Sequence, residues 1–253
     1  MRADLERLLE RRSISEKLRE ELISRSVDRA APSGIYLKKG FMQFPVVSTI
    51  CVPKYPSAPI FQQEHLVEKS IESWPRIAHL SRNVGLDIIQ GLCGRGSLSD
   101  SLLYYYSKEV KFVIEFSTYG AVSLISGPFE IINQRPYVRL GYLADSVIWP
   151  ILFAAKVTPY PCKYEVRIIL KQFDDCGIIG IQRQNKPDLH GIEKMEPLSI
   201  LRDEFITQWD PDMLIQVIER VARKVAWALN LSGSEESFAD EFKELLRTID
   251  GFN

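Results

Sequence analysis

Several features that mark common classes of enzyme and metalloprotein are missing from this 253-residue sequence. The four cysteines are scattered without a Cys-x-x-Cys pair, and only three histidines are present, so a zinc site is not expected. No histidine stands beside a small-residue elbow of the Gly-x-Ser-x-Gly type, which argues against a nucleophilic triad. We therefore expect neither a metal nor a cofactor.

Charge of one sign and long hydrophobic runs are also missing. The formal net charge is -1, which is unlike the single-sign surface of a dedicated nucleic-acid coat or membrane-surface binder. The longest apolar run, residues 142–157, contains Asp145 and Pro150 and is shorter than the roughly 20 residues needed to cross a bilayer. Residues 1–13 lack the apolar core of a signal peptide, so we expect a cytoplasmic protein with reduced cysteines.

What the sequence does contain is enough hydrophobic residues, 45%, to fill a sizeable core. Short β-like runs lie close together, and connections of a few residues favour antiparallel pairing over parallel crossovers. Residues 177–182 are expected to form a strand that pairs antiparallel with the run at 163–173. The sequence thus predicts an α+β fold with a mainly antiparallel sheet, built from the runs at 44–53, 85–90, 101–107, 111–116, 121–126 and 163–173.

The amino-terminal region is predicted to be helical and strongly charged. Ser13 and Glu16 fit a capping box that opens a second helix, whose apolar stripe is Ile14, Leu18 and Leu22. Two interpretations stay open, because such helices either cover their own domain or form an arm that binds a partner. We divide the chain into a helical arm, residues 1–31, and a single α+β domain, residues 34–253.

Further helices are predicted to cover the sheet. One spans about 62–82 and is divided by Pro75, and a buried one spans 138–157. The clearest begins after Asp210, which has the character of an N-cap, with Pro211 in the first helical position. A short acidic helix is expected to follow, ending near residue 249.

The most glycine-dense segment, residues 91–100, raises the question of a phosphate site. Its glycine spacing is that of a phosphate-binding loop, but Ser97 occupies the position of the lysine. One interpretation is a turn of small residues with an exposed arginine. The other is a site that contacts a phosphate or carboxylate through Gly94, Arg95, Gly96 and Ser97.

A metal-dependent nuclease or phosphodiesterase is an alternative. Such a centre needs an acidic residue on one strand and a Glu-x-Lys triplet on a neighbour, and Asp87, Glu109 and Lys111 occur in that order. A similar triplet at 241–243 shows that the pattern also arises by chance in a charged chain.

Two remaining signals are single residues or short runs. His190 falls in a predicted loop and is either solvated or a group that titrates near neutrality. The tyrosine run 104–106 either fills the two faces of a strand or stacks on bases, as in a single-stranded nucleic-acid binder.

Four segments resemble a known arrangement in order and spacing. Residues 46–61, 111–126, 142–157 and 163–178 are similar to the region that follows the AlbA-type DNA-binding domain in Schlafen-like bacterial and archaeal ATP-binding proteins. The resemblance covers about residues 42–182 and implies an accessory module that acts with a separate partner, in defence against foreign DNA. Residues 1–41 lack the glutamate-bearing strand and glycine pair of that domain, so no functional residue is carried over.

These observations favour a non-catalytic binding or interaction module. We expect it to be an accessory subunit of a larger nucleic-acid-related or defence assembly. Its partner, or a second copy, is expected to bind through the amino-terminal helices, and nucleic acid only through that partner.

Overall fold

The structure is a computed structural model. It describes most of the chain, in the ranges 2–31, 33–40, 45–74, 94–99, 102–107, 112–127, 129–132, 134–173, 176–179, 189–191, 198–229, 239–240, 242–243 and 246–247.

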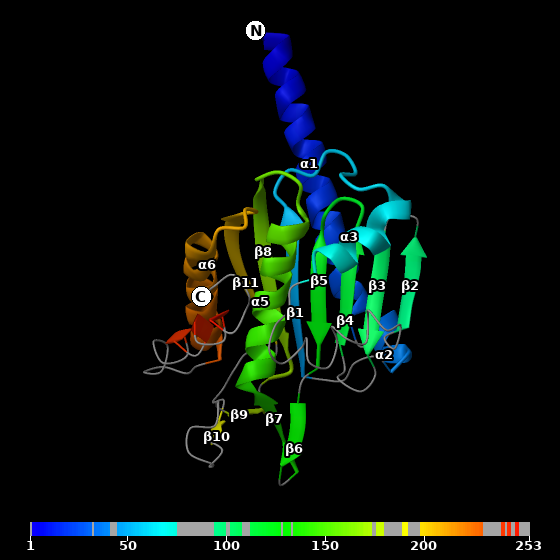
Figure 1. The fold of residues 1–253 in the computed structure, drawn as a ribbon. Coiled ribbons are helices and arrows are strands. Elements are labelled where there is room, and N and C mark those ends of the chain that lie inside the picture. Colours follow the sequence, from blue (N-terminus) through cyan, green and yellow to red (C-terminus); the bar gives the residue numbers. More distant parts are fainter. Residues whose placement is uncertain are drawn as a thin grey trace.

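A seven-stranded antiparallel sheet forms the centre of the molecule and confirms the predicted α+β fold (Figure 1). Long runs of β-branched and aromatic residues form its middle strands, because such side chains pack well on a pleated surface. In spatial order the strands are β11 (Leu198–Ile206), β8 (Lys163–Lys171), β1 (Val46–Pro53), β5 (Val122–Ser126), β4 (Phe112–Ser117), β3 (Leu102–Ser107) and β2 (Gly94–Ser99).

A smaller four-stranded sheet corrects one prediction. It consists of β10 (Leu189–Gly191), β9 (Gly177–Ile179), β7 (Arg135–Arg139) and β6 (Phe129–Ile132), and β9 pairs parallel with β7. The predicted antiparallel return to β8 is therefore wrong for residues 177–179, and residues 180–182 lie outside the described residues. The reason is that both edges of β8 are already used, one by β1 and the other by β11.

Strand β11 was not predicted, although it is as long as β8. It pairs with β8 along its whole length, from Leu198 opposite Lys171 to Ile206 opposite Lys163. Its alternation is weak, because Arg202 and Glu204 stand between Ile200 and Ile206 on one face.

One face of the large sheet is apolar and is covered by α5 (Leu140–Val157), α3 (Leu66–Glu72) and α6 (Pro211–Ala228), with a 3-10 turn, η1 (Gln63–His65), before α3. Helix α5 is buried almost throughout, as predicted, and Pro150 lies inside it. Its Trp149 and Phe153 rings stack at 4.8 Å between centroids, and Trp74 contacts both. The helical prediction for α6 is confirmed, since the Asp210 carboxylate accepts a hydrogen bond from the Met213 amide at 3.2 Å.

The opposite face is covered by α1 (Arg2–Arg29) and the short helix α2 (Ile35–Lys38). Helix α1 is continuous, so the predicted break at Ser13 is wrong. Glu16 does not reach back to cap a new helix but accepts a hydrogen bond from Arg12, one turn earlier. The buried positions also differ from the predicted stripe of Ile14, Leu18 and Leu22: they are Ser15, Ile23 and Ser26, followed by Ala30 just after the helix.

The core on the α5 side predicts a sharp difference between two tryptophans. Replacing Trp149, which is 1% exposed, with alanine should lower the free energy of unfolding by about 3–5 kcal/mol, because it leaves a cavity among aromatic rings. Replacing Trp227, which is 74% exposed, should change it by less than about 0.5 kcal/mol. Urea unfolding followed by circular dichroism measures both, and equal losses would contradict the packing described.

Candidate interaction site

A buried carboxylate fixes the second half of α1 on the sheet. Glu115 projects from β4 towards α1 and is 3% exposed. Its Oε2 atom accepts hydrogen bonds from the Ser26 and Ser123 hydroxyls, both at 2.7 Å, and from Arg29 at 2.8 Å. Its Oε1 atom accepts from the Nε atom of Arg29 and from the Tyr36 hydroxyl. Groups from β5, α1 and α2 thus meet at one carboxylate.

These contacts decide the charge of the cluster. Burial would by itself raise the pKa of Glu115, but hydrogen bonds and charge from Arg29, with hydrogen bonds from Tyr36 and Ser123, hold that pKa below its usual value. Burial, together with the nearby carboxylate, raises the pKa of Tyr36. Glu115 is therefore an anion at neutral pH, and the Tyr36 hydroxyl keeps its proton and donates a hydrogen bond to it.

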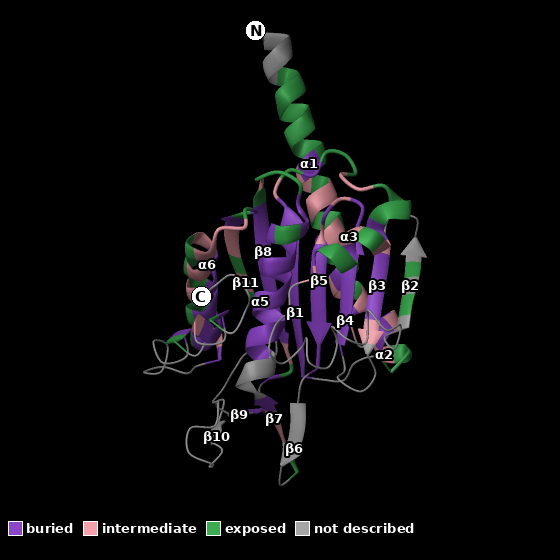
Figure 2. Ribbon diagram, viewed as in Figure 1, coloured by how far each residue is buried: buried purple, intermediate pink, exposed green. Residues whose placement is uncertain are grey.

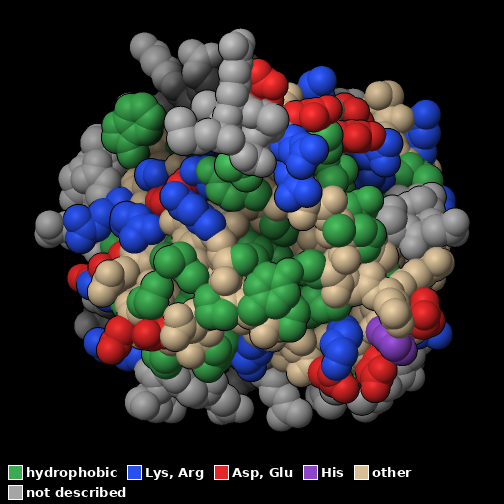
Figure 3. Space-filling model, turned by 90° about the horizontal axis from the view of Figure 1, so that it is seen from above, with side chains coloured by type: hydrophobic (Ala, Val, Ile, Leu, Met, Phe, Trp, Pro, Cys, Tyr) green, Lys and Arg blue, Asp and Glu red, His purple; other side chains and the backbone are tan. Residues whose placement is uncertain are grey.

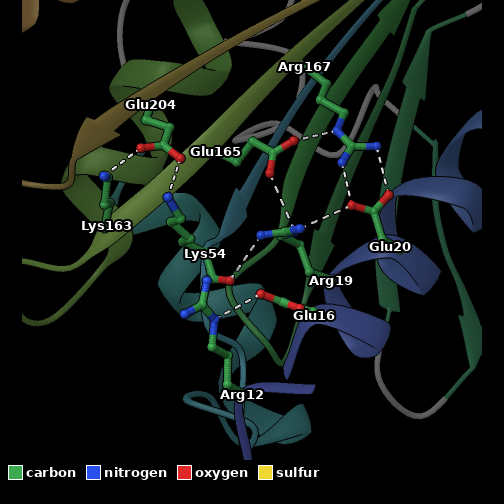
Figure 4. Close-up of polar contacts among 9 residues, drawn as sticks. All are labelled: Arg12, Glu16, Arg19, Glu20, Lys54, Lys163, Glu165, Arg167 and Glu204. Carbon is green, nitrogen blue, oxygen red and sulfur yellow. Dashed lines mark hydrogen bonds and ion pairs between the residues drawn. The ribbon is translucent and has the colours of Figure 1, made fainter. Parts of the chain in front are cut away.

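A second group of ion pairs joins α1 to β8 (Figure 4). Arg167 donates to both carboxylate oxygens of Glu20, at 2.9 and 2.5 Å, and also to Glu165. Arg19 contacts Glu165 at 3.3 Å and Glu20 at 3.2 Å. Hydrogen bonds from Arg167 are the main cause that lowers the pKa of Glu20. Acidic and basic groups thus alternate across the boundary between the helix and the sheet.

The ion pairs continue to the end of the sheet at which β1 and β11 finish. Lys54 and Lys163 both bind Glu204 of β11, and Arg19 donates to the Lys54 carbonyl at 3.5 Å. We call this end of the sheet the apical end. Because α1 crosses it near Arg19, the residues that precede Ser15 extend beyond the sheet (Figures 1 and 4).

The projecting part of α1 is exposed on every side from Glu6 to Ile14, which Figure 2 shows in green. Leu8 is 62% exposed, and Leu9 and Ile14 are each 56% exposed. We call residues 6–14 the arm. Leu8 and Leu9 are adjacent in the sequence, so the arm presents two large apolar side chains to solvent.

Apolar side chains also gather at the apical end beneath the arm. Figure 3 looks down on this end and shows hydrophobic groups across its centre, with charged groups around them. The loops after β1 and α5 supply them. We call this surface the apical patch, and its main members are Tyr55, Pro59, Ile60, Pro159, Tyr160 and Pro161, all exposed or half-buried.

The glycine-dense segment is not the predicted turn where the structure describes it. Residues 94–99 form β2, an edge strand paired with β3 from Gly94 opposite Tyr106 to Ser99 opposite Leu102. Arg95 and Ser97 are exposed, and the Ser97 hydroxyl donates to the Leu102 carbonyl at 3.3 Å. The segment is a strand because its successive residues pair with β3, with one irregularity between Ser97 and Ser99. The phosphate contact by Gly94, Arg95, Gly96 and Ser97 stays a prediction.

The structure describes some of the other candidate residues but not all of them. Asp87, Glu109 and Lys111 lie outside the described residues, so the nuclease centre stays a prediction. His190 lies in β10 rather than in a loop. Within the described ranges, no three His, Cys, Asp or Glu side chains come close enough to hold a metal ion.

The tyrosine run fills both faces of β3, as one of the two interpretations predicted. Tyr105 faces α3, accepts or donates a hydrogen bond with Ser70 at 2.7 Å, and lies against Trp74. Tyr104 lies on the other face against Tyr36. Both are buried, so neither ring is available to stack on bases.

The residues that form the Glu115 cluster were missed by sequence reasoning. The available signal was a single glutamate inside the apolar strand 112–116, since a charge in such a run is either solvated or paired. Its partners could not be found by spacing, because Arg29 and Tyr36 are far from it in sequence.

Comparison with protein-family models, curated proteins and solved structures finds no match to this chain. Among the described helices, none combines the length and the apolar character that crossing a membrane requires. The fold and the site define an α+β protein whose amino-terminal helix is pinned to the sheet by buried ion pairs.

The Glu115 cluster predicts a large stability difference. Glu115→Ala leaves the Arg29 guanidinium and Tyr36 hydroxyl without their acceptor and should cost at least about 2 kcal/mol of unfolding free energy. Glu16→Ala removes only an exposed pair with Arg12 and should cost less than about 0.5 kcal/mol. Urea unfolding measures both, and similar costs would show that the cluster does not hold α1.

The lowered pKa of Glu115 also predicts a pH dependence. Because the folded-state pKa lies below the unfolded one, the stabilisation is complete above the ordinary glutamate value of roughly 4.3 and is lost as pH falls through the folded pKa. Glu115→Gln cannot titrate there. The free energy of unfolding should therefore fall more between neutral and acidic pH in the wild type than in Glu115→Gln, and equal falls would contradict the assignment.

Proposed function

We propose that this protein is a non-catalytic interaction module that binds a protein partner through the arm of α1. The observation that carries the proposal is the exposure of Leu8 and Leu9 on a helix whose other half is bound to the sheet by ion pairs. A helix exposed on all sides gains little from its own domain. Because the arm is already helical and attached to the sheet, it loses little conformational entropy when a partner binds its apolar side chains.

The chemistry of the described residues supports binding rather than turnover. The buried pair of Glu115 and Arg29 joins helix to sheet, and the larger group formed by Arg19, Glu20, Glu165 and Arg167 does the same. The exposed ion pairs at the apical end likewise have both partners in place. These charges position the arm.

We further propose that the module serves as an accessory subunit of a nucleic-acid-related or defence assembly. This part of the proposal is based on the resemblance of residues 42–182 to the accessory region of Schlafen-like proteins. The alternative function, a metal-dependent nuclease or phosphodiesterase, depends on Asp87, Glu109 and Lys111, and no contact among the described residues favours it.

The test is a comparison of tagged wild type with two surface variants in the cells that make the protein. Leu8→Glu/Leu9→Glu should lose a bound protein that the wild type retains, because two charges replace the apolar surface. Trp227→Glu, on α6, should retain it, since Trp227 is also exposed but lies away from the arm. Mass spectrometry of the bound fraction, including differently tagged copies of the chain itself, measures the difference.

Two results would overturn the proposal. The first is binding that is the same in Leu8→Glu/Leu9→Glu as in the wild type. The second is cleavage of DNA or RNA by the purified protein with Mg²⁺ that disappears in Glu109→Gln while the variant stays folded.

A further inference from the structure

The sheet-facing side of α1 does not end where the sheet ends. At 3.6 residues per turn, Leu8 precedes the buried Ser26 by about five turns, and Leu9 precedes the half-buried Val27 by the same length. Both leucines therefore lie on the side of α1 that contacts the sheet further along. Ile14 lies on another side, about three turns before the exposed Arg25.

This side of the arm rises beside the apical patch (Figure 1). Helix α1 crosses the apical end at Arg19, which donates to the Lys54 carbonyl next to Tyr55. Leu8 lies roughly 16 Å further along the helix axis, since each residue adds about 1.5 Å. The arm and the patch thus form the two walls of an open apolar corner, and a straight helix cannot fold back to close it (Figures 1 and 3).

We infer that a second copy of this chain occupies the corner, with Leu8 and Leu9 of each arm packed on the apical patch of the other copy. The inference rests on the proposed function, because it names the partner that the arm binds. The dimer interface then continues the contact between α1 and its own sheet, because both use the same side of α1.

The second copy is favoured because both complementary surfaces belong to one chain. A two-fold axis satisfies both arms and both patches at once and leaves no open end. The charges agree with this arrangement: the arm carries Glu6 and Glu10 against Arg7, Arg11 and Arg12, and Glu16, which pairs with Arg12 just below the arm, completes a neutral set. Two identical arms therefore approach without net repulsion.

The apical patch offers exposed apolar surface on which Leu8 and Leu9 of another copy can pack. Tyr55 and Tyr160 are about half exposed, so their rings offer apolar area that is not already used by the fold. Three of the other four main members are prolines, whose restricted backbone loses little entropy when it is covered.

The inference is tested by sedimentation equilibrium of the purified full chain over the micromolar range. The wild type should form a reversible dimer. Leu8→Glu/Leu9→Glu should raise the dimer dissociation constant at least about 100-fold, and Tyr160→Glu at least about tenfold. Ile14→Glu is the matched control, since Ile14 and Leu9 have equal exposure on the same helix, and it should change the constant less than about threefold.

Mixing two variants tests the reciprocal exchange directly. A heterodimer of Leu8→Glu/Leu9→Glu with Tyr160→Glu keeps one intact contact, the wild-type arm of the second on the wild-type patch of the first. Each homodimer keeps none. The mixture should therefore associate more tightly than either variant alone, whereas a general loss of folding would not be rescued in this way. Circular dichroism of each variant confirms the helix content.

Three results would overturn the inference: a wild type that stays monomeric, a dimer unaffected by Leu8→Glu/Leu9→Glu, or an equal effect of Ile14→Glu. A monomeric wild type whose arm still captures another protein in cells removes the second copy as the partner and leaves the proposed function standing. If the wild type dimerises but Leu8→Glu/Leu9→Glu still captures the same other protein in cells, the arm binds a second copy and not that other protein. The self-association then stands and the binding of a different partner through the arm does not.

Discussion

The buried ion pair between Glu115 and Arg29 is the interaction on which the arrangement of α1 depends. A carboxylate at this depth is costly unless every lone pair is used, and here Ser26, Tyr36 and Ser123 complete its surroundings. The partners come from three elements, α1, α2 and β5, so the same contact that neutralises the charge also sets where α1 and α2 lie. Geometry and electrostatics are therefore settled together.

The two faces of the sheet have different physical characters. The α5 face is held by apolar packing among large side chains, which is strong but not directional. The α1 face is held by a few apolar residues and by directional contacts such as Arg167 with Glu20 and Glu165. Directional contacts fix the angle at which a helix leaves its sheet. This explains how a surface of two leucines is presented at a constant position beyond the apical end.

Most of the fold was accessible from local patterns. Runs of β-branched and aromatic residues identified β1, β3, β4, β5 and β8, and Asp210 followed by Pro211 identified the start of α6. Patterns failed where pairing is decided at a distance. Nothing in the residues of β9 distinguishes this strand from one that pairs with β8. The edge of β8 that it would need is occupied by β11, which lies much later in the sequence. The predicted helix start at Ser13 is also wrong, because the residues around Ser13 do not show that the preceding helix continues through it.

The sequence by itself determined the class of the fold, the buried nature of α5 and the presence of a charged amino-terminal helix, since these follow from composition and from periods of 2 and 3.6 residues. Only the tertiary structure decided that Glu115 is paired with Arg29, and that Leu8 and Leu9 lie beyond the end of the sheet. Such facts depend on which distant segments meet, and hydrophobic periodicity describes the face of an element but not its partner.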